Sequence, residues 1–330
     1  MLHGAAVFIA LVLLSLIVGF SQIKTEGLGW QEAHYMPRLE AVVAGEAPAP
    51  WQYRVLTDNL VVAVCRAAEF VGIPRPVGIT FGALRLLQNM AIFALAFFYY
   101  RKLGLHTYAL IIGLSALAWG MTQSNYGSDL AFNAYTDILF YLGAALVLLH
   151  RRYEWLIPIT VLAALNRETS GLLPVMALVC AVPLFHAARQ DHDLRRNAVI
   201  ALGLYAAIQI ALWLNFGVRE WVVHPSGATP GLSMLHYNLG NDAAWGHVAG
   251  TLGIVPLLAL LSYRSWHPLL RPLFWAVAPA WILIHLFCAP LDESRVLLLP
   301  QVLVFIPGML CGLAHWREGQ DEEPKGGLVA

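Results

Sequence analysis

Long apolar segments that carry almost no charge recur along nearly the whole chain. Folded as an α-helix, each is long enough to approach the roughly 30 Å hydrocarbon layer of a bilayer. Helices suit such segments because lipid offers no hydrogen-bond partner to the backbone. The segments lie at 4–20, 77–100, 106–122, 131–150, 155–187, 198–216, 247–263, 271–290 and 295–315. The sequence therefore predicts an all-α, polytopic transmembrane bundle.

The composition excludes a soluble protein and argues against nucleic-acid binding. Hydrophobic residues make up 59% of the chain and charged residues 12%, whereas soluble domains carry about 25% charged residues. Twenty basic and twenty acidic residues balance, so no basic excess is available for a phosphate backbone. We expect membrane lipids around the chain and no nucleic-acid partner.

Segment 155–187 is too long for one span and carries a polar break. The break holds Asn166, Arg167, Glu168 and Thr169, and Gly171 and Pro174 follow it. We interpret the segment as two spans, which brings the prediction to about ten. The polar turn is expected below the membrane surface, because the first of the two spans is short.

Segment 55–73 has apolar residues at helical spacing with Asp58, Arg66 and Glu69 among them. This pattern is typical of an amphipathic helix that rests on a membrane interface. We predict such a helix on the outer surface.

Basic residues favour one orientation, since short cytoplasmic loops are rich in Lys and Arg. Ten spans with a cytoplasmic N-terminus put every basic doublet on one side: Arg101 and Lys102, Arg151 and Arg152, Arg189 with Arg195 and Arg196, and Arg264 with Arg271. We predict a multi-pass inner (plasma) membrane protein whose active face is periplasmic or extracellular. Residues 1–315 form one transmembrane domain, and 316–330 form a disordered cytoplasmic tail.

Five polar residues share one face of the fourth span, because they are three or four positions apart: Tyr126, Asp129, Asn133, Asp137 and Tyr141. A carboxylate inside a membrane costs at least about 2.5 kcal/mol, so this face is expected to line a cavity or meet a cation. The alternative is a purely structural network.

Further polar groups lie at the predicted outer ends of spans. Asn166, Arg167 and Glu168 suggest a polar pocket, with a local ion pair as the alternative. Asp292, Glu293 and Arg295 join the last two spans, where a simple polar turn is the alternative. In the outer loops, Tyr53 and Arg54 precede the surface helix, and His236 belongs to loop 217–246. No set of ligands at metal-binding spacing is found, so no metal site is predicted.

Taken in order, several of these elements resemble the GT-C superfamily of polytopic glycosyltransferases. They are Glu32 with His34, Tyr35 and Gly45, then Tyr53 to Leu56, Asn133 to Asp137, Asn166 to Thr169, and Glu293 to Arg295. The similarity extends over residues 4–315. Two departures are a Glu where the family usually has an Asp in the first outer loop, and a C-terminus without a soluble outer domain.

The resemblance implies transfer of a sugar from a polyprenyl-phosphate donor to an unknown acceptor on the outer face, with no cofactor. It assigns the catalytic acid to Glu32, with Glu26 and Glu40 as competitors and Asp137 as the alternative base. Arg54, Arg167 and Arg295 are predicted to bind the donor phosphate, because guanidinium groups bind phosphate through two hydrogen bonds. The predicted cavity residues are Tyr53, Tyr126, Asp129, Asn133, Asn166, Glu168, His236, Asp292 and Glu293.

Two other functions stay open. A transporter or flippase component would use the aspartates of the fourth span as substrate or ion ligands near the bilayer midplane. A non-catalytic subunit of a membrane complex would use the outer polar groups as contacts. Charges that cluster toward one side favour the enzyme over the transporter.

Overall fold

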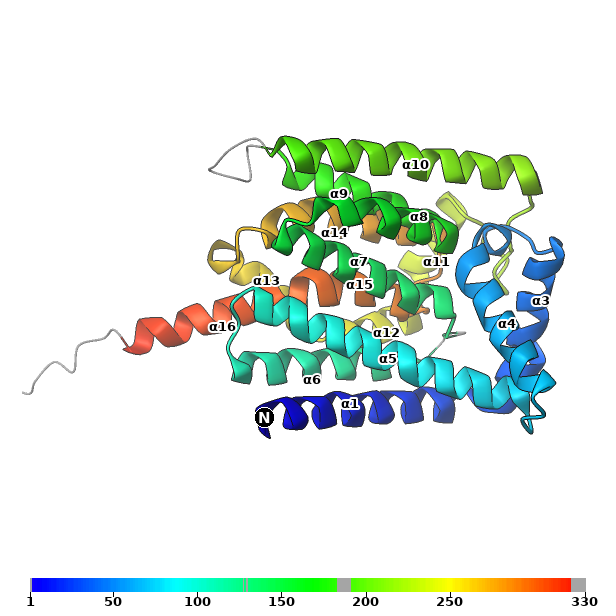
Figure 1. Cartoon of the computed structure of the whole chain (residues 1–330), viewed down its shortest axis with the longest axis horizontal. Coiled ribbons are helices and arrows are strands. Elements are labelled where there is room, and N and C mark those ends of the chain that lie inside the picture. Colours follow the sequence, from blue (N-terminus) through cyan, green and yellow to red (C-terminus); the bar gives the residue numbers. More distant parts are fainter. Residues whose placement is uncertain (1, 127, 129, 183–190, 322–330) are drawn as a thin grey trace, which may run out of the picture.

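The computed structural model describes residues 2–126, 128, 130–182 and 191–321. These residues are helical apart from their loops and one isolated bridge between Ala49 and Trp221. Long helices lie roughly side by side along the longest axis of the molecule (Figure 1). The α-helices are α1 (Leu2–Glu26), α2 (Leu28–Trp30), α3 (Met36–Ala44), α4 (Val55–Phe70), α5 (Pro76–Lys102), α6 (Thr107–Gln123), α7 (Phe132–His150), α8 (Leu156–Asn166), α9 (Leu172–Cys180), α10 (His192–Phe216), α11 (Leu232–Gly240), α12 (Asp242–Leu252), α13 (Val255–Leu261), α14 (Leu270–Cys288), α15 (Leu298–Pro300) and α16 (Ile306–Asp321).

Six helical stretches are long and apolar enough to cross a membrane, or seven if α12 and α13, bent by 62°, count as one span. The protein is therefore a multi-pass membrane protein by helix length and composition. The count of about ten spans is not confirmed. The six stretches are Gly4–Thr25, Pro76–Lys102, Phe132–His150, His192–Phe216, Leu270–Cys288 and Ser294–Trp316.

The remaining predicted spans are helical but short. α6 has 17 residues, α8 has 11 and α9 has 9. At 1.5 Å per residue, α8 and α9 are each about 15 Å long, which is half of a hydrocarbon layer. The predicted break in segment 155–187 is confirmed, because α8 ends at Asn166 and a 3₁₀ turn (Glu168–Gly171) separates it from α9. Residues 183–187 of that segment lie outside the described residues.

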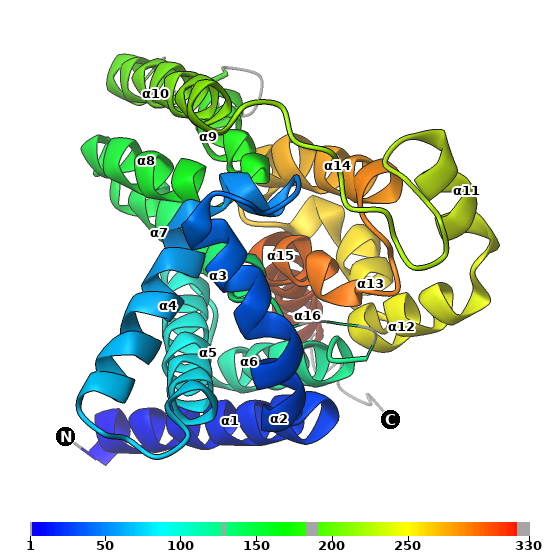
Figure 2. The ribbon, with the colours of Figure 1, turned by 90° about the vertical axis from the view of Figure 1, so that its right-hand side faces the viewer.

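Helix α4 confirms that 55–73 is largely helical, and it runs across one end of the bundle together with α3 (Figures 1 and 2). Val61 and Val62 on its buried side join a small core with Leu39 and Phe81. The contact between α3, α4 and α5 therefore holds this crossing layer against the bundle. Its position on a membrane surface stays a prediction.

The last helical stretch is the most buried of the six, with 83% of its apolar window inside the structure. It includes a π-helical turn at Gln301–Phe305. Such a turn leaves carbonyl groups without their usual helical partners. The hydroxyls of Tyr99 and Tyr100 donate to the carbonyls of Leu303 and Val302, both at 2.9 Å. These bonds fix α5 against the centre of the bundle.

The two ends of the bundle differ in charge. The C-termini of α5 and α7 and the N-terminus of α10, which carry the predicted basic doublets, lie at the end opposite to α3 and α4 (Figure 1). This arrangement agrees with the side that the sequence assigned to these doublets. The predicted tail at 316–330 begins within α16, which continues to Asp321, and its other residues lie outside the described part.

The charge difference makes the orientation testable. We expect the end with α3 and α4 to face outward, because basic loops stay in the cytoplasm. Glu46 and His106 are exposed at opposite ends. With the native cysteines replaced by alanine, Glu46→Cys should react with a membrane-impermeant thiol reagent on intact cells, and His106→Cys only after permeabilisation. The reverse pattern would contradict the orientation.

Candidate functional site

Helix α3 crosses one end of the bundle (Figure 2), and several of the predicted polar residues line a cavity together with Arg38 of this helix. Two segments, residues 45–54 and 217–231, lie over this end, and we call them the covering loops. A parallel bridge joins Ala49 to Trp221, and the Ala49 amide donates to the carbonyl of Glu220 at 2.8 Å. The covering loops are therefore linked to each other through their backbones.

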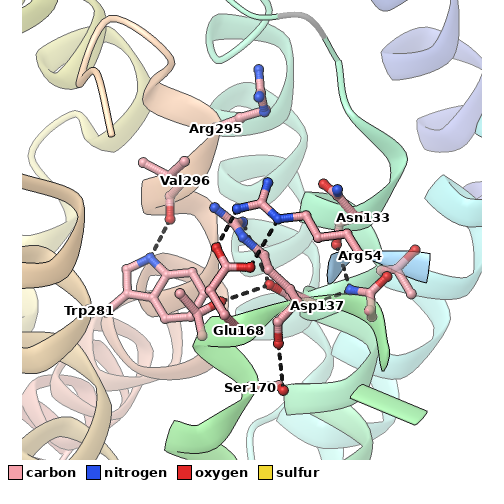
Figure 3. A network of polar contacts seen from close by, with 12 residues as sticks. Arg54, Asn133, Asp137, Glu168, Ser170, Trp281, Arg295 and Val296 are labelled. Atoms are coloured by element: carbon pink, nitrogen blue, oxygen red, sulfur yellow. Dashed lines mark hydrogen bonds and ion pairs between the residues drawn. The ribbon is translucent and has the colours of Figure 1, made fainter. Parts of the chain in front are cut away.

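Arg54 and Glu168 form a two-bond ion pair across 114 residues of sequence. The Arg54 Nε donates to Glu168 Oε2 at 3.0 Å, and Nη2 donates to Oε1. Arg54 is buried at the start of α4, and Glu168 begins the turn between α8 and α9. Burial acts to lower the pKa of Arg54, but the Glu168 carboxylate outweighs it and the pKa is raised. Figure 3 shows this pair beside Asp137.

Asp137 is completely buried on α7 and is held by three partners. Its Oδ1 accepts a hydrogen bond from Asn166 Nδ2 at 2.7 Å, and its Oδ2 accepts one from Thr169 Oγ1 at 3.3 Å. Asp137 also forms an ion pair with Arg167, whose Nη1 lies 3.6 Å from Oδ2. The Thr57 hydroxyl on α4 donates to Asn166. A buried carboxylate needs such compensation, so this network anchors the turn between α8 and α9.

His285 on α14 completes the surroundings of Arg167. The His285 Nε2 lies 3.3 Å from Arg167 Nη2, and its Nδ1 lies 2.8 Å from the Trp281 carbonyl. A carbonyl only accepts and a guanidinium only donates, so His285 carries its proton on Nδ1 and accepts through Nε2. His285 is therefore a neutral acceptor that orients Arg167.

Arg295 is buried in the turn that precedes α15. Its Nη2 donates to Glu293 Oε2 at 2.7 Å, and its Nη1 donates to the hydroxyl of Ser128. In Figure 3, Arg295 lies above Arg54, Asp137 and Glu168.

A cavity of about 390 Å³ brings the arginines together. Arg54, Arg167, Arg295 and Arg38 all line it, and Glu293 is the only carboxylate among its described lining residues. The partners Asp137 and Glu168 do not belong to this lining. The cavity therefore presents guanidinium groups whose counter-charges lie mostly behind them, which is an arrangement that suits an anion.

Arg38 was not predicted as a site residue. Its guanidinium lies 4.2 Å from the centre of the Tyr35 ring and 4.6 Å from that of Trp51. Such cation–π contacts help to hold a guanidinium in place. The sequence offered little reason to choose Arg38, because it belongs to the short helix α3 and to none of the polar motifs.

His285 was also missed. The sequence did contain an indication of it, because an ionisable residue inside an apolar span is a candidate functional residue. Its proximity to Arg167, however, depends on the packing of α14 against the turn between α8 and α9.

Glu32 and Asp137 were predicted as alternative catalytic bases. Neither of them lines the cavity. Glu32 Oε1 accepts a hydrogen bond from the Gly78 amide at 3.0 Å, in the first turn of α5. Asp137 lies behind Arg167. The predicted convergence on one cavity therefore holds for Arg54, Arg167 and Arg295 and does not extend to Glu32.

Tyr53, Tyr126 and His236 lie outside the lining. Tyr126 was predicted on the face of the fourth span, but α7 begins only at Phe132 and Tyr126 lies in the turn before it. The Tyr53 hydroxyl donates to the Gly217 carbonyl at 2.8 Å, so it links the covering loops. Tyr126 and His236 are exposed, and the Tyr126 ring lies 6.2 Å from that of His247.

The other predicted cavity residues have mixed positions. Asn133 and Glu293 line the cavity, whereas Asn166 and Glu168 support the residues that do. Asp292 accepts a hydrogen bond from the Tyr237 hydroxyl at 3.0 Å and lies beside the lining. Asp129 lies outside the described residues.

Comparisons with models of known protein families, with curated proteins and with solved structures give no match. The described residues contain no group of three or more His, Cys, Asp or Glu side chains placed to hold a metal ion.

The buried position of Asp137 predicts a large effect on stability. Asp137→Ala would leave Arg167 buried without its carboxylate, which typically costs about 3–5 kcal/mol. Unfolding of the purified protein in mild detergent should show a clear loss of stability. The matched control is Glu154→Ala, because Glu154 pairs with Arg152 at 3.9 Å on the exposed surface. Equal stability of the two variants would contradict the structural role of Asp137.

Proposed function

We propose that this protein is a GT-C-like membrane glycosyltransferase that moves a sugar from a polyprenyl-phosphate donor to an acceptor on the outer face of the plasma membrane. The observation that carries the proposal is the cavity lined by Arg38, Arg54, Arg167 and Arg295. A lipid-linked phosphodiester is an anion that lies at the membrane interface. A site of this charge at one end of a helical bundle suits it.

The supporting contacts give the arginines distinct roles in this proposal. Arg54 and Arg167 are fixed from behind by Glu168 and Asp137. Their guanidinium groups therefore need little reorganisation when a phosphate arrives, and preorganised donors are the most effective stabilisers of developing charge. Phosphate oxygens gain negative charge as the bond to the sugar breaks, so the same arginines would assist departure of the lipid phosphate.

The proposed transfer also needs a base. The base takes the proton of the acceptor hydroxyl, the new bond forms between that oxygen and the anomeric carbon, and the bond from that carbon to the phosphate oxygen breaks. Glu293 suits this role better than Glu32, because it lines the cavity and its side chain is 28% exposed. Its Oε2 accepts a hydrogen bond from Arg295 Nη2 at 2.7 Å, which helps to fix the carboxylate at the cavity wall.

The position of the charges favours this enzyme over a transporter component. A transporter needs polar groups that open toward both faces in turn, whereas the arginine cavity and its supporting carboxylates lie at the end that α3 crosses (Figures 2 and 3). A non-catalytic subunit would have no need of the ordered supports behind Arg54 and Arg167.

Phosphate binding is testable with lysine variants. A lysine keeps the charge but loses the planar two-bond geometry. We expect Arg54→Lys, Arg167→Lys and Arg295→Lys each to weaken binding of farnesyl phosphate about tenfold, as for loss of a charged hydrogen bond. Titration of the protein in nanodiscs measures this affinity. Arg152→Lys, at the opposite end, is the control. Unchanged affinity in all three variants would refute the phosphate assignment.

The identity of the base is testable with two matched variants. Glu293→Gln should lower transfer from a radiolabelled polyprenyl-phosphate sugar about 10²–10⁴-fold, which is the usual contribution of a general base. Glu32→Gln should retain transfer, since the amide oxygen still accepts from the Gly78 amide. The opposite result would restore Glu32 as the base, and normal transfer in both variants would exclude either carboxylate.

A further inference from the structure

The side chains of Asn133 and Arg167 in the cavity wall each carry a buried polar atom that has no hydrogen-bond partner among the described residues. These atoms are Asn133 Oδ1 and Arg167 Nε. Asn133 is 2% exposed and Arg167 is 6% exposed, and both residues line the cavity. Buried polar atoms are nearly always paired in folded proteins. Two unpaired atoms in one wall therefore call for a ligand that supplies both partners.

The Asn133 side chain is held in a fixed place. It lies in the first turn of α7, and its backbone carbonyl accepts a hydrogen bond from Asn166 Nδ2 at 3.0 Å. Asn166 is in turn bound to Asp137. The carboxamide of Asn133 therefore stays at the cavity wall while its backbone is anchored from behind.

The two unpaired atoms require different ligand groups. Arg167 Nε can only donate, so it needs an acceptor such as a phosphate oxygen. Asn133 Oδ1 accepts, so it needs a donor, and a phosphodiester has none. A hydroxyl both donates and accepts, so it satisfies the carboxamide in either orientation of its oxygen and nitrogen.

We infer that Asn133 is the specificity residue that binds a hydroxyl of the sugar, while Arg167 Nε binds the adjoining phosphate. This inference rests on the proposed function and adds that the sugar lies along the N-terminal turn of α7. The cavity then recognises a polyhydroxylated phosphodiester rather than lipid phosphates in general.

The test compares two diesters of equal charge in nanodiscs. One is methyl farnesyl phosphate, and the other is farnesyl phosphate esterified to glucose, galactose, mannose or arabinose. We expect the wild type to bind at least one sugar diester about tenfold more tightly than the methyl diester. Asn133→Leu should remove about three- to tenfold of that preference, as for loss of one hydrogen bond. It should leave the affinity for the methyl diester unchanged.

Asn197→Leu is the matched control, because Asn197 is a buried asparagine on α10 that donates only to the Asp193 carbonyl of its own helix. Asn133→Ser, which puts a hydroxyl in place of the carboxamide, should retain part of the preference. If Asn133→Leu does not fold, Asn133→Ala takes its place as the variant that removes the side-chain hydrogen bond.

Three outcomes would overturn the inference. If the wild type binds both kinds of diester equally, phosphate binding stands and sugar recognition fails. If Asn133→Leu weakens both diesters equally, Asn133 is structural. If neither diester binds, the proposed function fails and the inference fails with it.

Discussion

The pairing of buried arginines with carboxylates behind them is the interaction on which this end of the bundle depends. Arg167 and Asp137 are both almost fully buried and 3.6 Å apart. Either charge alone would be costly in an apolar bundle. Together with Asn166 and Thr169 they hold the turn between α8 and α9 inside the protein. A helix hairpin with a polar tip is stable there because its charges are compensated.

The same pairing decides what the cavity presents. Arg167 and Arg54 line the cavity, whereas their carboxylate partners Asp137 and Glu168 do not belong to its lining. Arg38 packs against the rings of Tyr35 and Trp51, which help to hold its guanidinium at the wall. The covering loops then close the cavity on the side of α3 through the bridge between Ala49 and Trp221. A cavity built in this way suits the proposed anionic substrate, because its cationic side chains are already held in place.

The fold explains why this site is found at one end only. Basic doublets occupy the other end, where they end α5 and α7 and begin α10. The middle of the bundle is an apolar core around the last helical stretch, fixed by the hydroxyls of Tyr99 and Tyr100. The position of the cavity at one end of the described bundle agrees with the proposed action on a substrate at the membrane interface.

The sequence by itself determined the helical architecture, the break at Asn166, the helix over most of 55–73 and the separation of basic from other polar loops. These features depend on hydropathy and on residues close together in the chain, which a linear pattern records. The sequence also indicated Arg54, Arg167 and Arg295 as one group.

Only the tertiary structure decided which carboxylate meets which arginine, that Glu32 binds the start of α5 instead of the cavity, and that Arg38 and His285 join the site. Several of these contacts join residues far apart in the chain, such as Arg54 and Glu168, which are 114 positions apart. They depend on the angles and depths at which several helices pack, and no local pattern encodes those.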